Sequence, residues 1–440
     1  MLRNRFKILI CFTIALVFII PGLCRADYDY IDINSPSMRK IPIAIPFFKS
    51  IASNSTELRF SKKASDLLVE TLEFTGYFNI QDRKAFLSDP QKDGITTQSI
   101  NFQNWTVIGS ELLITGGVLV KGDTVQMELR LFDTFKGTLI VGKRYKGGMI
   151  HQRQMIRRFC SEVIYHLTGN KGFFNSKIAF VSKNSKRKEI YICDFDGYGS
   201  KRFTFINSTT LFPSWSSDGN RLAYTSYKKG KPDIYIQHLT EKEVYEVTKK
   251  GANIAPAWAP NTDALAATLS FSGDQEIYLL TGKGKIIKRL TNNRGIDVSP
   301  AWSPDGKKMA FVSDRAGSPQ IFIKDFRTGR VKRLTFEGKY NTQPSWSPKG
   351  DKIAYTGRGG GNLNIYVIGV DGKGLAQLTQ SNGSNESPAW SPDGSLIAFS
   401  STREGPSRIY VMTAYGTDQR RLLAMPGEQT NPKWSPEVNN

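Results

Sequence analysis

The sequence has 440 residues, of which 60 are Lys or Arg and 39 are Asp or Glu, so the formal net charge is +21. This length allows roughly two to four domains with large buried cores, and a hydrophobic content of 39% excludes a disordered chain. Three His leave little room for a histidine-rich metal site, and four Cys are too few for a disulfide scaffold. The charge indicates an acidic partner, such as nucleic acid or an anionic surface.

Residues 1–26 have the layout of a secretory signal peptide. Basic residues precede an apolar run over 8–20, and the segment ends at the small residue Ala26. The apolar run is shorter than the roughly 20 residues that span a bilayer. We therefore predict cleavage after Ala26 and no transmembrane segment in the mature chain. A retained membrane anchor and a lipoprotein modified at Cys24 are the alternatives. The leader holds four basic and no acidic residues, so its removal leaves a charge of +17.

Loss of the leader leaves two cysteines, Cys160 and Cys193. Export makes a disulfide between them chemically allowed. However, Cys160 lies on the apolar stripe of a predicted helix over 150–168, and Cys193 follows a strand-like segment over 190–192. The sequence therefore favours two separately buried thiols over a disulfide.

The second half of the chain is one unit repeated six times. A Pro-x-Trp element recurs every 43 or 44 residues, and each unit also has a Thr in a fixed register, except that the last unit has Leu423. The six elements are Pro213/Trp215, Pro256/Trp258, Pro300/Trp302, Pro344/Trp346, Pro388/Trp390 and Pro432/Trp434. Each unit reads as four short strands, and this period is typical of propeller blades. The repeat therefore predicts a six-bladed β-propeller.

The ends of the array predict how the ring closes. The first unit lacks its Trp strand, and only six residues follow the last Pro-x-Trp element. We expect the C-terminal strand to complete the first blade, which leaves no open edge. We interpret Asp218, Asp305 and Asp393, in the turns after the Trp strands, as turn residues and not catalytic acids, because an active site is not repeated in every blade. The Trp set is expected to pack between blades.

Residues 27–170 lack the repeat and predict a separate α/β domain. The expected elements are a strand over 41–48, a helix over 61–74, strands over 111–120, 124–132 and 138–146, and the helix over 150–168, stopped by Gly169. The predicted organisation is a signal peptide (1–26), an α/β N-terminal domain (27–170) with a mobile arm (27–38), and an all-β six-bladed propeller (171–440) closed by the C-terminal strand.

Several segments together carry a family resemblance. They are the exported leader, the strand over 41–48 after a short polar arm, the run 111–116, the join over 164–174 and the blade motif over 300–306. In this order they resemble the TolB family, the periplasmic propeller proteins of the Tol-Pal envelope system. The blade motif alone is not specific, because propellers attached to peptidases look similar.

The resemblance implies a monomeric, non-enzymatic scaffold in the periplasm, without cofactor or metal. It would link the inner-membrane protein TolA to the peptidoglycan-associated lipoprotein Pal, and would support outer-membrane integrity and envelope constriction during cell division. It implies that the arm binds TolA, for which the candidate residues are Tyr28, Tyr30, Ile31, Asp32 and Ile33. An extended segment of this kind can add as a strand to a partner sheet. A frayed terminus is the alternative for the arm.

The resemblance also implies that Pal binds one propeller face. The loops from each outer strand to the next Trp strand open on one face near the tunnel, and they are polar and differ between copies. The candidate residues there are Asn253, Asp297, Asn341, Asn385, Glu386, Gln429 and Thr430. Ordinary solvated loops are the alternative reading of these segments.

Two other functions are weighed against this one. A hydrolase of the prolyl oligopeptidase type needs a Gly-x-Ser-x-Gly elbow, and no such pentapeptide occurs in the sequence. A propeller that binds envelope glycans or polyanions would use the basic charge, because the segment 171–440 holds 38 basic against 24 acidic residues. Export makes nucleic acid an unsuitable target for that charge.

Overall fold

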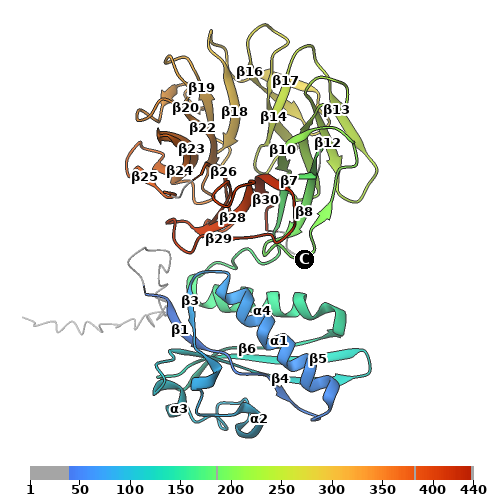
Figure 1. Ribbon diagram of the computed structural model, residues 1–440, viewed down its shortest axis with the longest axis vertical. Coiled ribbons are helices and arrows are strands. Elements are labelled where there is room, and N and C mark those ends of the chain that lie inside the picture. The colour runs from blue at the N-terminus through green and yellow to red at the C-terminus, as the bar shows by residue number, and fades with distance from the viewer. Residues whose placement is uncertain (1–38, 185–186, 381–382, 438–440) are drawn as a thin grey trace, which may run out of the picture.

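The computed structural model describes residues 39–184, 187–380 and 383–437. The predicted leader and the arm residues Tyr28, Tyr30, Ile31, Asp32 and Ile33 lie outside these ranges. Figure 1 shows an α/β part built from the first elements of the chain, and a ring of β-sheets built from the rest. No helix in the described ranges is both long and apolar enough to cross a membrane.

The α/β part is built on one mixed sheet of six strands. Its order is β3-β1-β4-β5-β6, with β2 beside β4. The strands are β1 (Ile41–Ala44), β2 (Lys49–Ser50), β3 (Phe78–Ile80), β4 (Leu112–Lys121), β5 (Thr124–Asp133) and β6 (Thr138–Gly148). β1 runs parallel to β3 and β4, whereas β4, β5 and β6 form an antiparallel meander. The three meander strands were predicted within two residues. The strand expected over 41–48 ends at Ala44.

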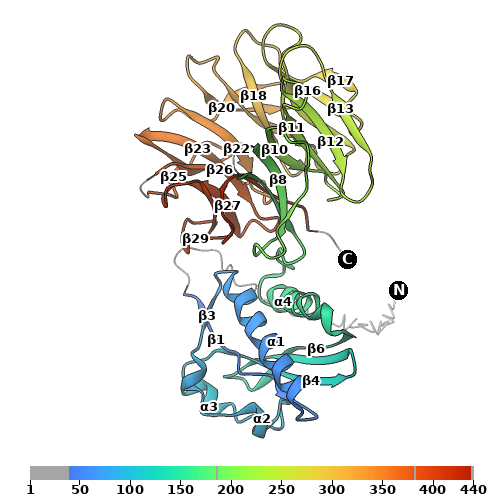
Figure 2. The ribbon, with the colours of Figure 1, turned by 45° about the vertical axis from the view of Figure 1, so that its right-hand side comes forward.

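Two long helices pack on this sheet, and Figure 2 shows α4 on the side toward the propeller. They are α1 (Ser55–Glu73) and α4 (Gln152–Thr168), and the short helices are η1 (Arg83–Ala85), α2 (Pro90–Asp93), α3 (Gln103–Thr106) and η2 (Met149–His151). α4 ends at Gly169, whose φ of 77° is favourable for glycine, as the sequence predicted. Trp105 of α3 belongs to a separate cluster with Leu113 and Phe132.

The prediction that the first helix begins at residue 61 was wrong. Asn54 caps α1, because its side-chain oxygen accepts a hydrogen bond from the Glu57 amide at 2.9 Å. The Glu57 carboxylate in turn accepts hydrogen bonds from the amides of Ile51 (2.6 Å) and Ala52 (3.1 Å). These bonds satisfy the backbone amides just before the helix, so residues 55–60 form its first turns.

The propeller consists of six four-stranded antiparallel sheets. Their orders are β10-β11-β12-β13, β14-β15-β16-β17, β18-β19-β20-β21, β22-β23-β24-β25, β26-β27-β28-β29 and β30-β7-β8-β9. The innermost strands are β10 (Thr210–Trp215), β14 (Asn253–Trp258), β18 (Asp297–Trp302), β22 (Asn341–Trp346), β26 (Asn385–Trp390) and β30 (Glu428–Trp434). The second strands are β11 (Arg221–Ser226), β15 (Ala264–Leu269), β19 (Lys308–Ser313), β23 (Lys352–Gly360), β27 (Leu396–Ser401) and β7 (Lys177–Asn184).

The two outer strands of each blade complete the ring. The third strands are β12 (Asp233–His238), β16 (Glu276–Thr281), β20 (Gln320–Asp325), β24 (Asn362–Gly369), β28 (Arg408–Thr413) and β8 (Arg187–Asp194). The outermost strands are β13 (Val244–Val247), β17 (Ile286–Arg289), β21 (Val331–Arg333), β25 (Ala376–Gln377), β29 (Arg420–Arg421) and β9 (Lys201–Arg202). The predicted closure is confirmed, because β30 pairs with β7 in a register that sets Trp434 opposite Ile178.

The third residue of each regular innermost strand, and Asn431 in β30, lies at a β-bulge with positive φ. The six residues are Phe212, Ala255, Ser299, Gln343, Ser387 and Asn431, with φ between 51° and 57°. The register with the second strand shifts at the same place in every blade. The bulge therefore repeats with the blade, although none of these residues is glycine.

In four blades the repeated Thr holds the third strand to the outer strand, namely Thr204, Thr291, Thr335 and Thr379. Thr248 is exposed and makes no such bond among the described residues. In the third blade of the chain, Thr291 Oγ1 donates to Glu276 Oε2 at 2.5 Å and accepts from the Ile277 amide at 2.9 Å. In the last blade the residue equivalent to Glu276 is Arg408, a side chain without an acceptor, and Leu423 replaces the Thr. The one exception to the Thr pattern is thus matched by loss of the group that the Thr would bind.

We expect Thr291→Val to lower the free energy of unfolding by about 1–3 kcal/mol, because it leaves a buried amide and a buried carboxylate without this partner. Urea unfolding of both proteins measures the difference. The control is Leu423→Thr, which should give no stabilisation because Arg408 offers no acceptor. Equal stability of Thr291→Val and the starting protein would contradict this role.

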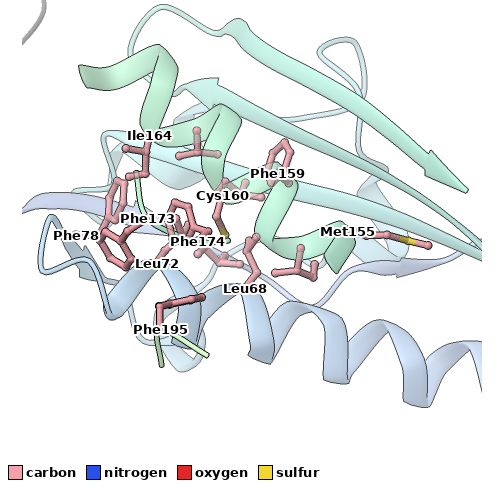
Figure 3. Close-up of a cluster of buried hydrophobic side chains, with 14 of the residues drawn as sticks. Leu68, Leu72, Phe78, Met155, Phe159, Cys160, Ile164, Phe173, Phe174 and Phe195 are labelled. Atoms are coloured by element: carbon pink, nitrogen blue, oxygen red, sulfur yellow. The ribbon is translucent and has the colours of Figure 1, made fainter. Parts of the chain in front are cut away.

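The α/β part and the propeller share one hydrophobic core. Figure 3 shows Phe173, Phe174 and Phe195 beside Leu72 of α1 and Ile164 of α4. Phe173 follows α4 in the chain, and its ring lies 5.4 Å from that of Phe195, which follows β8. The same cluster of buried side chains extends from the strands of the sheet to blades at the ring closure. The two parts are therefore joined by packed side chains and not only by a linker.

Ion pairs surround this shared core. Arg157 of α4 lies 2.9 Å from Asp194 at the end of β8, and Arg153 pairs with Asp196. Burial alone would raise the pKa of Asp194, but the positive charges of Arg157 and Lys177 outweigh it and lower that pKa. These ion pairs hold α4 against the first blade, and the charges of the arginines and aspartates neutralise one another.

The two remaining cysteines are buried and unpaired. Cys160 is a residue of α4 that faces the shared core, and Cys193 lies in β8. Burial raises the pKa of both thiols, so they are poor nucleophiles. The preference for two separate thiols is confirmed.

Candidate functional site

The innermost strands surround an axial tunnel through the propeller. At the end with the turns after the Trp strands, the tunnel opens into a cavity of about 590 Å³. A narrower cavity of about 70 Å³ lies among the bulge residues and their neighbouring prolines. The prolines Pro256, Pro300 and Pro344 line both cavities, so the two are continuous sections of one tunnel wall.

The six Trp side chains pack between blades, as predicted. The indole N–H of Trp215 donates to the Lys433 carbonyl at 3.0 Å, and that of Trp302 donates to the Ala257 carbonyl at 3.0 Å. Each of these bonds joins one blade to the neighbouring blade. The same six residues contribute to the wall of the larger cavity. Their main role is therefore to hold the ring together, with the tunnel wall as a consequence.

The turn aspartates are bonded within their own turns. Ser303 donates to Asp305 Oδ1 at 2.6 Å, and the Lys307 amide donates to the same oxygen at 3.1 Å. The Ser303 hydrogen bond is the main cause that lowers the pKa of Asp305. Ser391 bonds Asp393 and Ser216 bonds Asp218 in the same way. This arrangement explains the repeated aspartate as a turn residue.

The face predicted to bind a partner is formed by loops at the other end of the tunnel, but most residues predicted for it are not on its surface. Five are buried, mostly at the first positions of innermost strands: Asn253, Asp297, Asn341, Asn385 and Gln429. Their side chains hold loops in place: Asn253 Nδ2 donates to Asp233 Oδ1 at 2.8 Å, and Gln429 Nε2 donates to the Met425 carbonyl at 2.9 Å. Only Glu386 and Thr430 are half-exposed.

The expectation of exposed loop side chains at those five positions was therefore wrong. These residues begin strands and do not sit in the loops, and the strand turns each of these side chains into the blade. Hydrogen bonds then satisfy part of their polar atoms, as for Asn341 Nδ2, which donates to Gln320 Oε1 of the preceding blade at 2.9 Å. One oxygen each of Asn253, Asp297 and Gln429 has no hydrogen-bond partner among the described residues. Their polarity reflects this structural task.

Large apolar side chains on the same loops were missed by the sequence reasoning. We call them the aromatic loop set: Phe205, Tyr227, Phe271, Ile296, Phe336 and Tyr340. Phe205 is 72% exposed and Phe336 is 69% exposed, and both follow the repeated Thr of their blade. All six residues lie in loops between outermost and innermost strands or between second and third strands, which open on one face. The available signal was a phenylalanine at a position where the other copies carry Asn, Lys, Gln or Ala.

Cationic side chains accompany the aromatic loop set. Arg202 lies over the Phe205 ring at 4.7 Å, and Arg333 lies over the Phe336 ring at 4.8 Å. Further basic residues stand in or beside the loops of this face: Lys183, Arg187, Lys188, Lys228, Lys229, Lys231, Lys249, Lys250, Arg294, Arg315, Lys339, Arg358 and Arg403. Acidic residues in or beside these loops are fewer: Glu189, Asp233, Asp274, Glu276, Asp297, Asp314, Glu337, Glu386, Glu404 and Glu428.

Of the two sets of loops at the ends of the tunnel, the set on this face therefore carries the basic excess. Lys231 and Arg315 pair with the buried Asp233 and Asp297, but most of the other cations have no buried counter-charge. In the loops at the opposite end of the tunnel, acidic residues outnumber basic ones among those the structure describes. A face with this charge and these aromatic side chains suits an acidic or mixed partner surface.

Two ionisable side chains line the tunnel itself. Lys433 borders both cavities, and burial lowers its pKa to about 8. Glu437 lines the larger cavity, where burial raises its pKa to about 7, and its Oε1 accepts the Asn175 amide at 3.1 Å. No cluster of three or more metal-ligating side chains was found in the described parts of the chain.

We expect Lys433→Ala to raise the free energy of unfolding by about 1–3 kcal/mol at pH 7. The unfolded lysine has a pKa of about 10.4, so between pH 8 and 10.4 the unfolded state binds more protons and the stability of the original protein rises with pH. The advantage of the alanine variant should therefore be largest below pH 8 and fade by about pH 10.5. Urea unfolding from pH 6 to 10.5 measures it. A difference in the free energy of unfolding that does not change with pH would contradict the lowered pKa of Lys433.

Comparisons with known proteins agree with this architecture. Residues 29–140 match the TolB amino-terminal domain, and residues 164–438 match the TolB beta propeller domain. The second match alone spans more than half of the sequence. The chain belongs to the TolB family. The sequence-based recognition and the fold class, an α/β part followed by a six-bladed propeller, are both confirmed.

Individual relatives carry the same description. A "Tol-Pal system protein TolB" from Desulfosudis oleivorans is 58% identical over 280 residues, which cover 64% of each chain. A "Protein TolB homolog" from Chlorobaculum tepidum is 41% identical over 291 residues, covering 66% of this chain and 65% of that protein. The matched region thus spans slightly less than two thirds of these relatives. The crystal structure of TolB from Acinetobacter baumannii superposes with a TM-score of 0.80 at 27% identity, covering 91% of this chain and 97% of that one.

Proposed function

We propose that the chain is a non-enzymatic periplasmic scaffold of the Tol-Pal system, exported by cleavage after Ala26. It binds Pal through the propeller face that carries the aromatic loop set, and it binds TolA through the arm over 27–38. This linkage would support outer-membrane integrity and envelope constriction during cell division. Membership of the TolB family and the Tol-Pal names of its relatives support a role in this system.

One observation carries the choice of face. The loops that open opposite the turn aspartates combine exposed aromatic side chains with cations stacked on them, as at Phe205 and Phe336. Large exposed apolar side chains rimmed by charge are typical of protein interaction sites. Glu386 and Thr430, which were proposed from sequence, lie half-exposed at the inner margin of these loops and remain candidates. The buried members of the sequence-based set are expected to act only by holding the loops.

The test uses purified mature chain with purified Pal and TolA domains from the same organism. We expect the double variant Phe205→Ser/Phe336→Ser to weaken Pal binding at least about tenfold, because truncating aromatic anchors in an interface typically costs 2 kcal/mol or more. Isothermal titration calorimetry measures both affinities. Deletion of 27–38 should abolish TolA binding.

The chain offers a matched control. Phe135 is 69% exposed, as is Phe336, but it lies in the α/β part between β5 and β6. Phe135→Ser should leave Pal affinity unchanged. Pal affinity that is insensitive to the double variant, or equally sensitive to Phe135→Ser, would overturn the proposed face, and absence of binding to either partner would overturn the proposed role.

The basic loops favour one second candidate, which is binding of envelope glycans or other polyanions. This function predicts binding that falls steeply as salt rises and that needs no protein partner. It would depend on cations such as Lys228, Lys249 and Arg294, and not on Phe205 or Phe336. Sedimentation with purified envelope polysaccharide at low and high salt separates the two proposals.

A further inference from the structure

The wall of the tunnel has one cation that the blade repeat does not require. The residue between Pro and Trp in each innermost strand is small in five blades, and in the sixth it is Lys433. The five small residues are Ser214, Ala257, Ala301, Ser345 and Ala389. Since five blades form with a small residue here, the lysine is not part of what builds a blade.

The Lys433 ammonium has no counter-charge in the described structure. It makes no ion pair within 4.0 Å and no hydrogen bond among the described residues, although its backbone carbonyl accepts from Trp215. Among the residues that the structure describes, Glu437 is the only other ionisable side chain that lines the two cavities. Burial is the sole cause of the lowered pKa of Lys433, and no nearby carboxylate opposes it. At a pKa of about 8 the group is still mostly protonated at neutral pH.

The surroundings of this ammonium have the character of a small-molecule site. The larger cavity has about 590 Å³, within the range of ordinary ligand pockets. Its wall is formed by the six Trp rings and by prolines and alanines, with the hydroxyls of Ser214 and Ser345 nearby on the same ring of positions as Lys433. Lys433 is half-buried, and serine hydroxyls share the wall with the apolar side chains. A cation without a counter-charge beside Trp and Pro side chains favours a ligand with one negative charge and an apolar body.

We propose that the tunnel of the propeller is a binding site for a monoanionic carboxylate with an apolar body, which enters from the face of the turn aspartates and places its carboxylate on Lys433. The ligand would supply the counter-charge that the described residues do not provide. The same chemistry can come from a free organic acid or from the C-terminal carboxylate of a peptide. This site is separate from the aromatic loop set, which lies at the other end of the tunnel.

The experiment uses the mature chain and fluorine NMR titrations with 4-fluorophenylacetate and with its neutral amide. We expect saturable binding of the acid with a dissociation constant on the order of 1 mM, and binding of the amide at least tenfold weaker. A short peptide that ends in free 4-fluorophenylalanine, compared with its C-terminal amide, tests the second source. Tighter binding of the peptide acid than of the small acid assigns the site to peptides, and the reverse assigns it to free acids.

Two variants test the residue. Lys433→Ala introduces the residue already present at Ala257, Ala301 and Ala389, so it should fold, and it should weaken binding of the acid at least tenfold. Lys349→Ala removes an exposed cation from a turn on the same face and should change nothing. Equal binding to the Lys433→Ala protein, or no saturable binding up to about 10 mM acid, would overturn the proposal. Pal affinity should be the same in both variants, so failure here is distinct from failure of the proposed function.

Discussion

Deletion of residues 428–440 is expected to prevent the chain from forming its closed ring. β30 is the innermost strand of the blade that also contains the first strands of the propeller, and it pairs only with β7. Without it, β7 becomes a free edge next to the tunnel, and Trp215 loses the Lys433 carbonyl. Trp434 also leaves the core shared with the α/β part. We expect loss of the cooperative unfolding transition of the propeller, measured by circular dichroism during heating and by limited proteolysis.

A complementation experiment controls this deletion. A synthetic peptide covering 428–440 should restore the transition when mixed with the truncated chain, because it can pair with β7 as β30 does. The same peptide with Trp434→Ala should restore it poorly, since the indole packs in the shared core beside Phe173, with ring centroids 5.6 Å apart. A truncated chain that unfolds at the same temperature as the full one would show that closure does not hold the ring.

Phe173→Ala is expected to uncouple the α/β part from the propeller. Phe173 is buried between the two parts, with ring centroids 6.0 Å from Phe74 of the first helix's end and 5.4 Å from Phe195 of the first blade. Replacing a buried phenylalanine by alanine typically costs 3–5 kcal/mol. We expect the single calorimetric unfolding transition to split into two. The transition at the lower temperature would belong to the part that loses more of its contacts.

The control for this substitution is Phe205→Ala. Its side chain is 72% exposed, so its loss should change the free energy of unfolding by no more than about 0.5 kcal/mol. A single transition at an unchanged temperature in the Phe173→Ala protein would mean that the shared core does not couple the two parts.

The repeated half of the chain could be predicted closely because the same sequence pattern recurs in each blade. The Trp positions, the turn aspartates and the incomplete end units together determined the blade number and the closing strand. The exception at Leu423 was visible in the sequence, but its explanation was not, because it depends on Arg408 lying opposite it in the folded blade.

The α/β part and the partner face were harder to predict for physical reasons. The start of α1 depends on the capping bonds of Asn54 and Glu57, which outweigh a polar stretch that looks like a loop. On the propeller, polar residue type was taken as a sign of exposure. Asn253 and Gln429 are polar because they hold the loops from within, whereas the exposed positions are aromatic.

The charge of the chain also has a more specific meaning in the folded protein. Among the loops of the propeller, the cationic ones carry the aromatic loop set, and those at the opposite end of the tunnel are more acidic. Long-range attraction would therefore orient an acidic partner toward the aromatic face before contact. The rate of association should fall with ionic strength more than the rate of dissociation rises.

Hydrogen–deuterium exchange of the mature chain with and without purified Pal tests the central claim most directly. The account predicts protection of the loops that contain Phe205, Tyr227, Phe271, Ile296, Phe336 and Tyr340, with unchanged exchange in the turns at Asp218, Asp305 and Asp393. Protection confined to those turns or to the α/β part, with the aromatic loops exchanging as in the free chain, would contradict it.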